Sequence, residues 1–429
     1  MKRILISELK EEFINEKVLI KGWVHRIRIL KKVTFILVRD RSGVVQCVID
    51  NESINNVELK NESVIEIVGK VVSSQNKISN IEVVVENINI LSKVKDELPI
   101  EVNNGLDIKL ETMLDNRVLS LRKENINFIL KVKAILAQGF REFLIRDGFT
   151  EIFTPKIVKD GAEGGTNLFN LKYFENTAYL AQSPQFYKQM MVAAGYEKVF
   201  EIAHVYRAEE HDTRRHLNEY VSMDLEMGFI EDEKDIMRIE NQLLIYLMEK
   251  LRLEMSEAEE KFQFHIPKVP ETIPYITFKE AKDILKKHYN KINSEEDLDP
   301  QCEELIYEYA KTYLDSEFIF ITDYPKSKRP MYAMPKGKNF THSFDLIFRG
   351  MEITTGGQRI HDYDMLVNNF INKGLDPSNF GSYTEIFKYG VPPHGGLAIG
   401  LERLTCQILG LKNVREASAF PRDRQRLLP

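Results

Sequence analysis

The stretch Val199-Phe200-Glu201-Ile202-Ala203-His204-Val205-Tyr206-Arg207-Ala208-Glu209 predicts a β-strand that ends in charged residues. Side chains alternate between the two faces of a strand, so Arg207 and Glu209 are expected on one face. After a charged loop, the run Tyr220-Val221-Ser222-Met223-Asp224-Leu225-Glu226 predicts a second strand with Tyr220, Asp224 and Glu226 on a common face.

If these strands form a hairpin, a cation, an aromatic ring and carboxylates converge on one ligand, and such a set suits a nucleotide. The alternative is a solvated sheet face with salt bridges. The loop Arg214-Arg215-His216 weakens that alternative, because it can reach phosphate oxygens.

A second group of charged residues lies between Ser343 and Arg359. Arg349-Gly350 predicts a turn, which would bring Asp345 and Glu352 together on adjacent strands. Two ionised carboxylates indicate a magnesium site completed by phosphate oxygens and water, with ordinary surface carboxylates as the alternative. Gly356-Gly357 would let a substrate approach the backbone, leaving Arg359 to reach a carboxylate.

Two further segments indicate binding chemistry. The run from Gln182 to Gln189 predicts a helix start with Ser183 at the N-cap, which places Gln185 and Lys188 one turn apart. Lys188 borders an apolar run, so it is either a snorkelling lysine or an ammonium presented to an anionic substrate. The glycine-rich run 395–404 is not a P-loop, and a tight packing turn is the alternative to close contact with a nucleotide.

The pattern along the chain predicts two domains. Residues 1–92 carry short β runs that suit a small closed barrel, either an oligonucleotide-binding barrel or one without a ligand. Residues 93–121 lose periodicity and predict a linker. Residues 122–429 predict an α+β domain, an antiparallel sheet flanked by helices, in which residues 255–300 form a solvated helical insertion.

Composition narrows the class of protein. With 43% hydrophobic and 29% charged residues, the 429-residue chain is expected to be globular, and its net charge of -6 argues against a generally basic nucleic-acid binder. Three isolated cysteines argue against a zinc site or a disulfide framework. Since no apolar stretch suits a spanning helix or a signal region, we expect a cytoplasmic protein with no membrane partner.

Taken in order, these segments resemble the three signature motifs of class II aminoacyl-tRNA synthetases. Gly148-Phe149-Thr150-Glu151-Ile152-Phe153-Thr154-Pro155 looks like the first, Tyr206-Arg207-Ala208-Glu209 with its return strand like the second, and Gly400-Leu401-Glu402-Arg403 like the end of the third. The resemblance covers almost the whole chain and implies an anticodon-reading barrel and a homodimer. Residues 182–189 resemble the aspartate members, and Phe420-Pro421-Arg422-Asp423-Arg424 resembles their archaeal type.

The resemblance implies ligation of L-aspartate to tRNA(Asp) through an aspartyl-adenylate made from ATP with Mg²⁺. It implies ATP contacts at Arg207, Ala208, Glu209, Arg215, His216, Leu217, Tyr220, Glu352, Gly400, Leu401, Glu402 and Arg403, of which Arg207, Glu352 and Arg403 are catalytic. It implies aspartate contacts at Glu163, Gln185, Lys188, Arg207, Asp224, Thr355 and Arg359, and magnesium contacts at Asp345, Glu352 and Thr355. In these placements Lys188 and Arg359 bind the side-chain carboxylate, Asp224 binds the amino group, and Glu163 belongs to a lid.

In the barrel, Phe35, Gln46 and Glu82 resemble the family's base readers, which stack on bases and contact their edges. His25 and Ile78 resemble the residues of relaxed members that charge both tRNA(Asp) and tRNA(Asn), whereas a strictly discriminating member can carry a lysine in place of Ile78. A strict tRNA(Asp) enzyme is therefore the alternative.

The same fold allows three other assignments, two enzymatic and one noncatalytic. An asparagine enzyme is disfavoured by Lys188, because an ammonium meets no anionic side chain there. A tRNA-independent adenylating amide synthetase is expected to lack the barrel. A noncatalytic RNA-binding paralogue would tolerate the loss of Arg207, Glu352 or Arg403, and this chain has all three.

Overall fold

The computed structural model describes residues 1–51, 59–76, 78–103, 107–161, 167–210 and 213–428. The chain divides into two compact units, Met1–Lys123 and Glu124–Pro429. The boundary follows the stretch predicted as a linker, and two short helices, α1 (Leu110–Asp115) and α2 (Arg117–Ser120), lie within that stretch. Among the described residues, no helix is long and apolar enough to cross a membrane.

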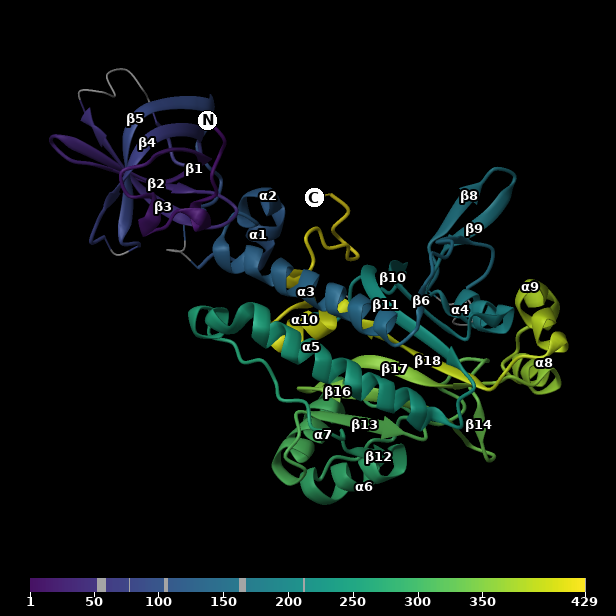
Figure 1. Cartoon of the computed structure of the whole chain (residues 1–429). Helices are drawn as coiled ribbons and strands as arrows, with labels where there is room; N and C mark the ends of the chain where they lie inside the picture. The colour runs from purple at the N-terminus through teal and green to yellow at the C-terminus, as the bar shows by residue number, and fades with distance from the viewer. Residues whose placement is uncertain (52–58, 77, 104–106, 162–166, 211–212, 429) are drawn as a thin grey trace. The chain divides into compact units, whose positions relative to one another are not determined.

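The first unit contains a closed five-stranded barrel, which confirms the predicted architecture (Figure 1). Its strands, in the order β1-β2-β3-β5-β4, are β1 (Lys17–Ile29), β2 (Val33–Arg39), β3 (Val44–Asp50), β4 (Val64–Ser73) and β5 (Ile81–Ser92). Buried and partly exposed residues alternate along β2 and β3, so Ile36 and Val45 point into the barrel core while Phe35 and Gln46 point outward. The barrel surface therefore carries the residues predicted to read bases.

The second unit is built on an eight-stranded sheet in the order β12-β13-β16-β17-β18-β11-β10-β6. Neighbouring strands are antiparallel except at the two edges, where β12 and β6 pair in parallel with their neighbours. The strands are β6 (Thr150–Glu151), β10 (Lys198–Tyr206), β11 (Glu219–Gly228), β12 (Tyr275–Thr277), β13 (Phe318–Thr322), β16 (Ser343–Phe348), β17 (Met351–Arg359) and β18 (His394–Gly400). This arrangement confirms the predicted antiparallel sheet.

Three helices pack against this sheet and close the main core (Figure 1). They are α3 (Glu124–Arg146), α5 (Glu233–Phe262) and α10 (Leu401–Leu409). Apolar residues at helical spacing, such as Phe140 on α3 and Leu244 on α5, pack with Phe200 and Leu225 from the sheet. Burying these faces holds the hairpin β10–β11 and the strand β18 as a rigid floor.

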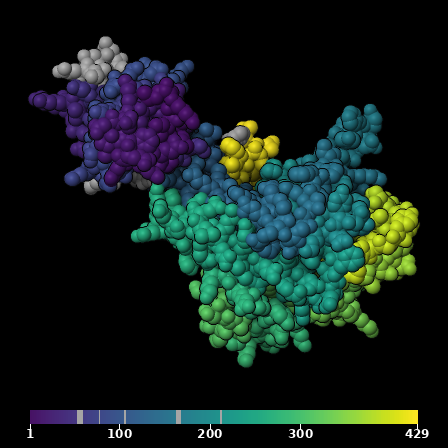
Figure 2. Space-filling view, in the orientation of Figure 1, coloured from purple at the N-terminus to yellow at the C-terminus, as the bar shows by residue number. Residues whose placement is uncertain are grey.

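The remaining elements surround the sheet. They are β7 (Ile157–Val158), β8 (Asn170–Tyr173), β9 (Asn176–Leu180), α4 (Gln185–Met191), α6 (Phe278–Tyr289), α7 (Pro300–Tyr313), β14 (Pro335–Lys336), β15 (Phe340–Thr341), α8 (Tyr363–Asn372) and α9 (Gly381–Thr384). The β8–β9 hairpin projects from the surface of this unit (Figure 2).

Residues 255–300 differ from the predicted solvated insertion. The helix α5 continues to Phe262, β12 joins the edge of the main sheet, and α6 buries Phe278 and Leu285 against Ile306 of α7. The high charge of the segment lies on the outer faces of these helices, and charge content alone does not reveal a buried inner face.

Candidate active site

A cleft with a volume of about 120 Å³ lies over the hairpin β10–β11 and the strands β17 and β18. It is lined by Arg207, Glu209, Arg215, His216, Leu217, Tyr220, Ser222, Glu352, Ile353, Thr355, Ala398, Gly400, Glu402, Arg403 and Val414. Ten of the twelve residues predicted to contact ATP through the resemblance belong to this lining, and the other two are Ala208 and Leu401. The cleft thus brings together residues from three of the predicted segments, namely the hairpin, the charged group between Ser343 and Arg359, and the glycine-rich run 395–404.

The hairpin forms as predicted, but its first strand ends earlier. The strand β10 stops at Tyr206, and Arg207 lies just beyond it, with its backbone N–H donating to the carbonyl of Asn218 at 2.8 Å. The guanidinium carbon of Arg207 lies 5.9 Å from the ring centre of Tyr220. Because both groups line the cleft, a cation and an aromatic face are available to one ligand.

Two arginines that line the cleft, Arg215 and Arg403, are held by neighbouring groups. Arg403, near the start of α10, donates from Nη1 to the backbone carbonyl of Glu352 at 3.0 Å. Arg215 pairs with Glu303 at 2.9 Å and donates to the carbonyl of Gly350 at 2.8 Å. These contacts hold two guanidinium groups at the cleft, where phosphate oxygens would meet them.

Three residues predicted to contact ATP do not present free side chains to it. Leu401 is 2% exposed and belongs to the main core, because α10 turns its apolar face to the sheet. The carboxylate of Glu402 accepts from the backbone N–H of Val221 at 3.0 Å and pairs with Lys133 at 2.6 Å, so it holds α10 in place. Ala208 lines a neighbouring cavity instead of the cleft.

Two glycines in the segments predicted to let a ligand approach the backbone, Gly356 and Gly396, have a packing role instead. Gly400 lines the cleft, but a Cβ on Gly396 would lie 2.2 Å from the carboxylate of Glu226, and a Cβ on Gly356 would lie 2.4 Å from the ring of Phe344. Both positions therefore need glycine for packing between side chains of this protein, and the predicted approach of a substrate does not explain them.

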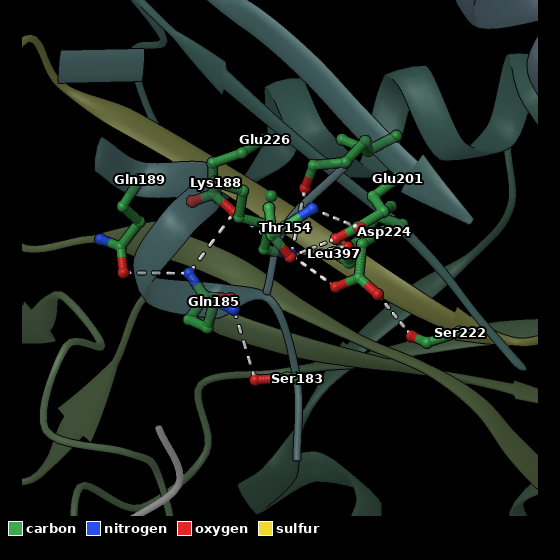
Figure 3. A network of polar contacts seen from close by, with 12 residues as sticks. Thr154, Ser183, Gln185, Lys188, Gln189, Glu201, Ser222, Asp224, Glu226 and Leu397 are labelled. Atoms are coloured by element: carbon green, nitrogen blue, oxygen red, sulfur yellow. Dashed lines mark hydrogen bonds and ion pairs between the residues drawn. The ribbon is translucent and has the colours of Figure 1, made fainter. Parts of the chain in front are cut away.

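A buried charged cluster adjoins the cleft beneath Ser222, whose hydroxyl donates to Asp224 (Figure 3). Lys188 of α4 is 2% exposed, and its Nζ lies 2.9 Å from Asp224 and 3.4 Å from Glu226. Nζ also donates to the carbonyls of Leu225 and Leu397, at 3.3 and 3.1 Å. Lys188 is thus not a snorkelling surface lysine but a fully enclosed cation.

Glu226 joins the two cations of the cluster. Arg359 donates from Nε to Glu226 at 3.0 Å and from Nη2 to the carbonyl of Gly396 at 2.9 Å. Burial acts to raise the pKa of Glu226, but Arg359 and Lys188 outweigh it and lower the pKa below its ordinary value. The sequence placed Glu226 on the face of Asp224, although it was not selected as a site residue; the period of two was the signal that could have found it.

The helix α4 begins one residue later than predicted. Its N-cap is Pro184, and Ser183 accepts a long hydrogen bond of 3.4 Å from the N–H of Gln185. Gln185 is nonetheless buried on the predicted face, where its Nε2 donates to Gln189 at 3.0 Å and approaches Glu226 at 3.5 Å. The two polar residues predicted on this helix therefore reach the same cluster.

The predicted turn at Arg349-Gly350 connects β16 and β17, and Asp345 pairs across the strands with Thr355. Thr355 donates to the carboxylate of Glu352 at 2.8 Å, and both line the cleft. Asp345 is buried, and its Oδ2 pairs with Arg329 at 2.6 Å. Burial raises the pKa of Asp345 to about 6, an effect that Arg329 opposes and Glu352 reinforces.

These carboxylates fit a divalent cation. The side chain of Tyr324 acts to lower the pKa of Asp345, but the buried Oδ1 atom of Asp345 makes no direct hydrogen bond of normal geometry among the described residues and can accept a cation. No group of three or more metal-ligating side chains occurs in the described part of the chain. A magnesium ion here would therefore need phosphate oxygens and water in addition to Asp345 and Glu352.

The barrel residues predicted to contact tRNA lie at two separate sites. Gln46 of β3 donates to Glu82 of β5 at 2.7 Å on the outer surface, and Ile78 is exposed in the turn before β5. His25 of β1 lies 2.9 Å from Arg39 and lines a separate cavity with residues 94–103. Glu163, predicted in a lid, lies outside the described residues.

A cleft lined by arginines, carboxylates and an aromatic ring over an antiparallel sheet, beside a buried charged cluster and in a chain with a closed five-stranded barrel, is the arrangement expected of a class II aminoacyl-tRNA synthetase. The chain belongs to the family described as tRNA synthetases class II (D, K and N), which matches residues 109–424, and residues 18–91 match the OB-fold nucleic acid binding domain.

The chain is similar along nearly its whole length to aspartate–tRNA ligases and to an asparaginyl-tRNA synthetase of known structure. It is 47% identical to the aspartate–tRNA(Asp/Asn) ligase of Deinococcus radiodurans, over 100% of this chain and 99% of that one. It is 43% identical to the aspartate–tRNA(Asp) ligase of Picrophilus torridus, over 98% and 99%. The structure of asparaginyl-tRNA synthetase from Pyrococcus horikoshii with asparaginyl-adenylate matches with a TM-score of 0.93 and 32% identity, over 100% of both chains.

Proposed function

We propose that this protein activates L-aspartate with ATP and ligates it to tRNA(Asp) and tRNA(Asn). The observation that carries the amino-acid assignment is the buried cluster of Lys188, Arg359, Asp224 and Glu226 beside the nucleotide cleft. The aspartate ligases among the relatives support the same assignment.

The charges of the cluster favour aspartate over asparagine. If Asp224 binds the substrate's ammonium group, the cations Lys188 and Arg359 remain with the single carboxylate Glu226. A substrate carboxylate completes the neutralisation of this set, whereas a neutral amide leaves one buried positive charge without a counterion. The similarity to an asparagine enzyme concerns the fold that both amino acids share.

The proposed reaction begins when the α-carboxylate of aspartate attacks the α-phosphorus of ATP. Arg207 stabilises the negative charge that develops on the α-phosphate, Tyr220 stacks on adenine, and Arg215 and Arg403 hold the departing pyrophosphate. Glu352 and Asp345 would hold magnesium, which would supply further charge neutralisation on the phosphates when bound. The 3′-terminal adenosine of tRNA then attacks the adenylate carbonyl, and AMP leaves. No side-chain nucleophile is needed, because positioning and electrostatics supply the rate acceleration.

The barrel surface supports acceptance of both tRNAs. Phe35 offers a ring for stacking, and Gln46 and Glu82 offer hydrogen-bonding edges. Ile78, exposed in the turn before Glu82, has neither charge nor donor with which to reject a base.

We expect labelled aspartate to be attached to transcripts of both tRNA(Asp) and tRNA(Asn), and labelled asparagine to neither. Aspartate on tRNA(Asp) alone would retain the activity and contradict relaxed recognition. Attachment of asparagine, or no attachment by folded protein, would contradict the proposed function. Exchanging Ile78 for Lys is the matched test of the barrel: a positively charged side chain should lower charging of tRNA(Asn) more than that of tRNA(Asp).

The edge of the catalytic sheet supports a homodimer. Phe153, directly after the short edge strand β6, is 85% exposed, and Ile145 and Ile157 nearby in the chain are also exposed. A large exposed apolar side chain beside an edge strand, such as Phe153, is typical of a surface that another chain covers.

Replacing Phe153 by Asp should shift the protein toward the 49.9 kDa monomer, because a carboxylate would be buried without a partner in the interface. Light scattering after gel filtration measures the mass. Phe174→Asp is the matched control, since Phe174 is also highly exposed but lies in the β8–β9 hairpin. An unchanged mass for Phe153→Asp, or an equal loss in the control, would speak against this surface.

A further inference from the structure

Glu303 is a buried carboxylate at the cleft that comes from outside the three signature motifs. It lies in the first turn of α7 and is only 9% exposed. The helix α7 follows the segment predicted as a solvated insertion, and its sequence gave no sign of a role in the site. Its inner face packs against β13, β16 and β17, which brings Glu303 behind the cleft wall.

One oxygen of Glu303 joins two segments of the site. Its Oε2 accepts from Nη1 of Arg215 at 2.9 Å and from the backbone N–H of Glu352 at 2.9 Å. Arg215 comes from the loop between β10 and β11, and Glu352 from the start of β17. A single carboxylate thus connects the loop that carries a phosphate-binding cation to the strand that carries the proposed magnesium ligand.

The contacts of Arg215 show what this connection does. Nη2 donates to the carbonyl of Gly350 at 2.8 Å, and the backbone carbonyl of Arg215 accepts from Arg403 at 3.4 Å. The guanidinium of Arg215 therefore donates from Nη1 to Glu303 and from Nη2 to Gly350. The plane of the group is therefore fixed, and because Nη2 also donates to Glu304 at 3.4 Å, two of its five N–H donors remain for the cleft that Arg215 lines.

The loop would not hold this geometry by itself. A long arginine side chain loses rotamer freedom when it is fixed, and an ion pair enclosed by protein offsets that cost better than one in water. Glu304, the next residue, also approaches Arg215, at 3.4 Å, but its side chain is 64% exposed. Of these two neighbouring carboxylates, the buried one has the geometry to fix the guanidinium.

We propose that Glu303 is a positioning residue for ATP, which orients Arg215 toward the phosphates and anchors the backbone of Glu352 beside it. The proposal rests on the proposed function for the identity of the nucleotide. It adds a residue that acts through Arg215 and does not itself contact the substrate.

The test compares Glu303→Gln with Glu304→Gln. Loss of a buried charge-assisted hydrogen bond should weaken binding of Mg·ATP by about tenfold or more in Glu303→Gln, measured by calorimetry. In aspartate-dependent exchange of pyrophosphate into ATP, the KM for ATP should rise similarly while the KM for aspartate stays unchanged. The control Glu304→Gln should change either value by less than about twofold, since it removes an exposed contact.

A double-mutant cycle with Arg215→Gln shows whether Glu303 acts through Arg215. If it does, adding Glu303→Gln to Arg215→Gln should weaken ATP binding by less than about twofold further. A multiplicative loss in the double variant, or ATP binding by Glu303→Gln within about twofold of the unmodified protein, would overturn the proposal.

Two measures separate this inference from other failures. If Glu303→Gln does not fold, Glu303→Asp keeps the charge and withdraws it by one methylene, so ATP binding should weaken by about threefold or more, and unchanged binding would refute the role. ATP binding is measured without amino acid, so it tests Glu303 even if the unmodified protein fails to exchange with aspartate. That failure would contradict only the proposed amino-acid substrate.

Discussion

Replacing Lys188 by Met should abolish aspartate-dependent exchange of pyrophosphate into ATP. The ammonium is enclosed and faces Asp224 and Glu226, so its removal leaves two buried carboxylates where the substrate must place a third. Breaking a buried ion pair by removing one partner costs about 3–5 kcal/mol, which corresponds to a loss of about 10²-fold to 10⁴-fold in kcat/KM. The exchange rate at saturating ATP, followed over a range of aspartate concentrations, measures the effect.

Lys156→Met is the matched control for this variant. Lys156 also pairs with a largely buried carboxylate, at 3.0 Å from Glu201 of β10, which lies opposite Asp224 across the hairpin, but Lys156 itself does not line the cleft. It should retain exchange with aspartate if folded. Binding of ATP by Lys188→Met reports that the nucleotide cleft is intact, and substantial aspartate-dependent exchange by that variant would refute the assignment of Lys188.

Replacing Arg207 by Gln should lower kcat for the same exchange by about 10²-fold to 10³-fold, the usual effect of removing one donor to a developing charge. The guanidinium group lines the cleft 5.9 Å from the ring centre of Tyr220, and in the proposed reaction it contacts the α-phosphate of ATP. Because the charge on the α-phosphate increases in the transition state, the loss should fall on kcat more than on the KM for ATP.

Arg238→Gln controls for the loss of an arginine in the same unit. Arg238 is an exposed residue of α5 paired only at its surface with Asp235, and its replacement should leave both kinetic constants unchanged. If Arg207→Gln raised the KM for ATP and left kcat intact, Arg207 would bind the ground state and would not stabilise the transition state.

Short-range sequence patterns predicted many of the residues of the candidate site. The alternation in Tyr220–Glu226 depends only on the geometry of a strand, and it correctly grouped Tyr220, Asp224 and Glu226. The turn at Arg349-Gly350 and the closed barrel likewise follow from short-range signals. Leu401 and Glu402 show the limit of this approach: a motif gives their position, but the packing of α10 against α3 and β11 decides that one is core and the other binds Lys133.

The sequence by itself determined the two-domain organisation, the hairpins and the chemical types of most residues that line the cleft, because these depend on composition and on contacts between near neighbours. Which charged side chains form ion pairs with one another was decided only by the tertiary structure. Lys188 meets Glu226, Arg329 meets Asp345, and Glu303 meets Arg215, in each case across elements that are far apart in the chain or on different layers. Such pairs arise when packed helices and strands bring distant segments together, and no periodicity within either segment records them.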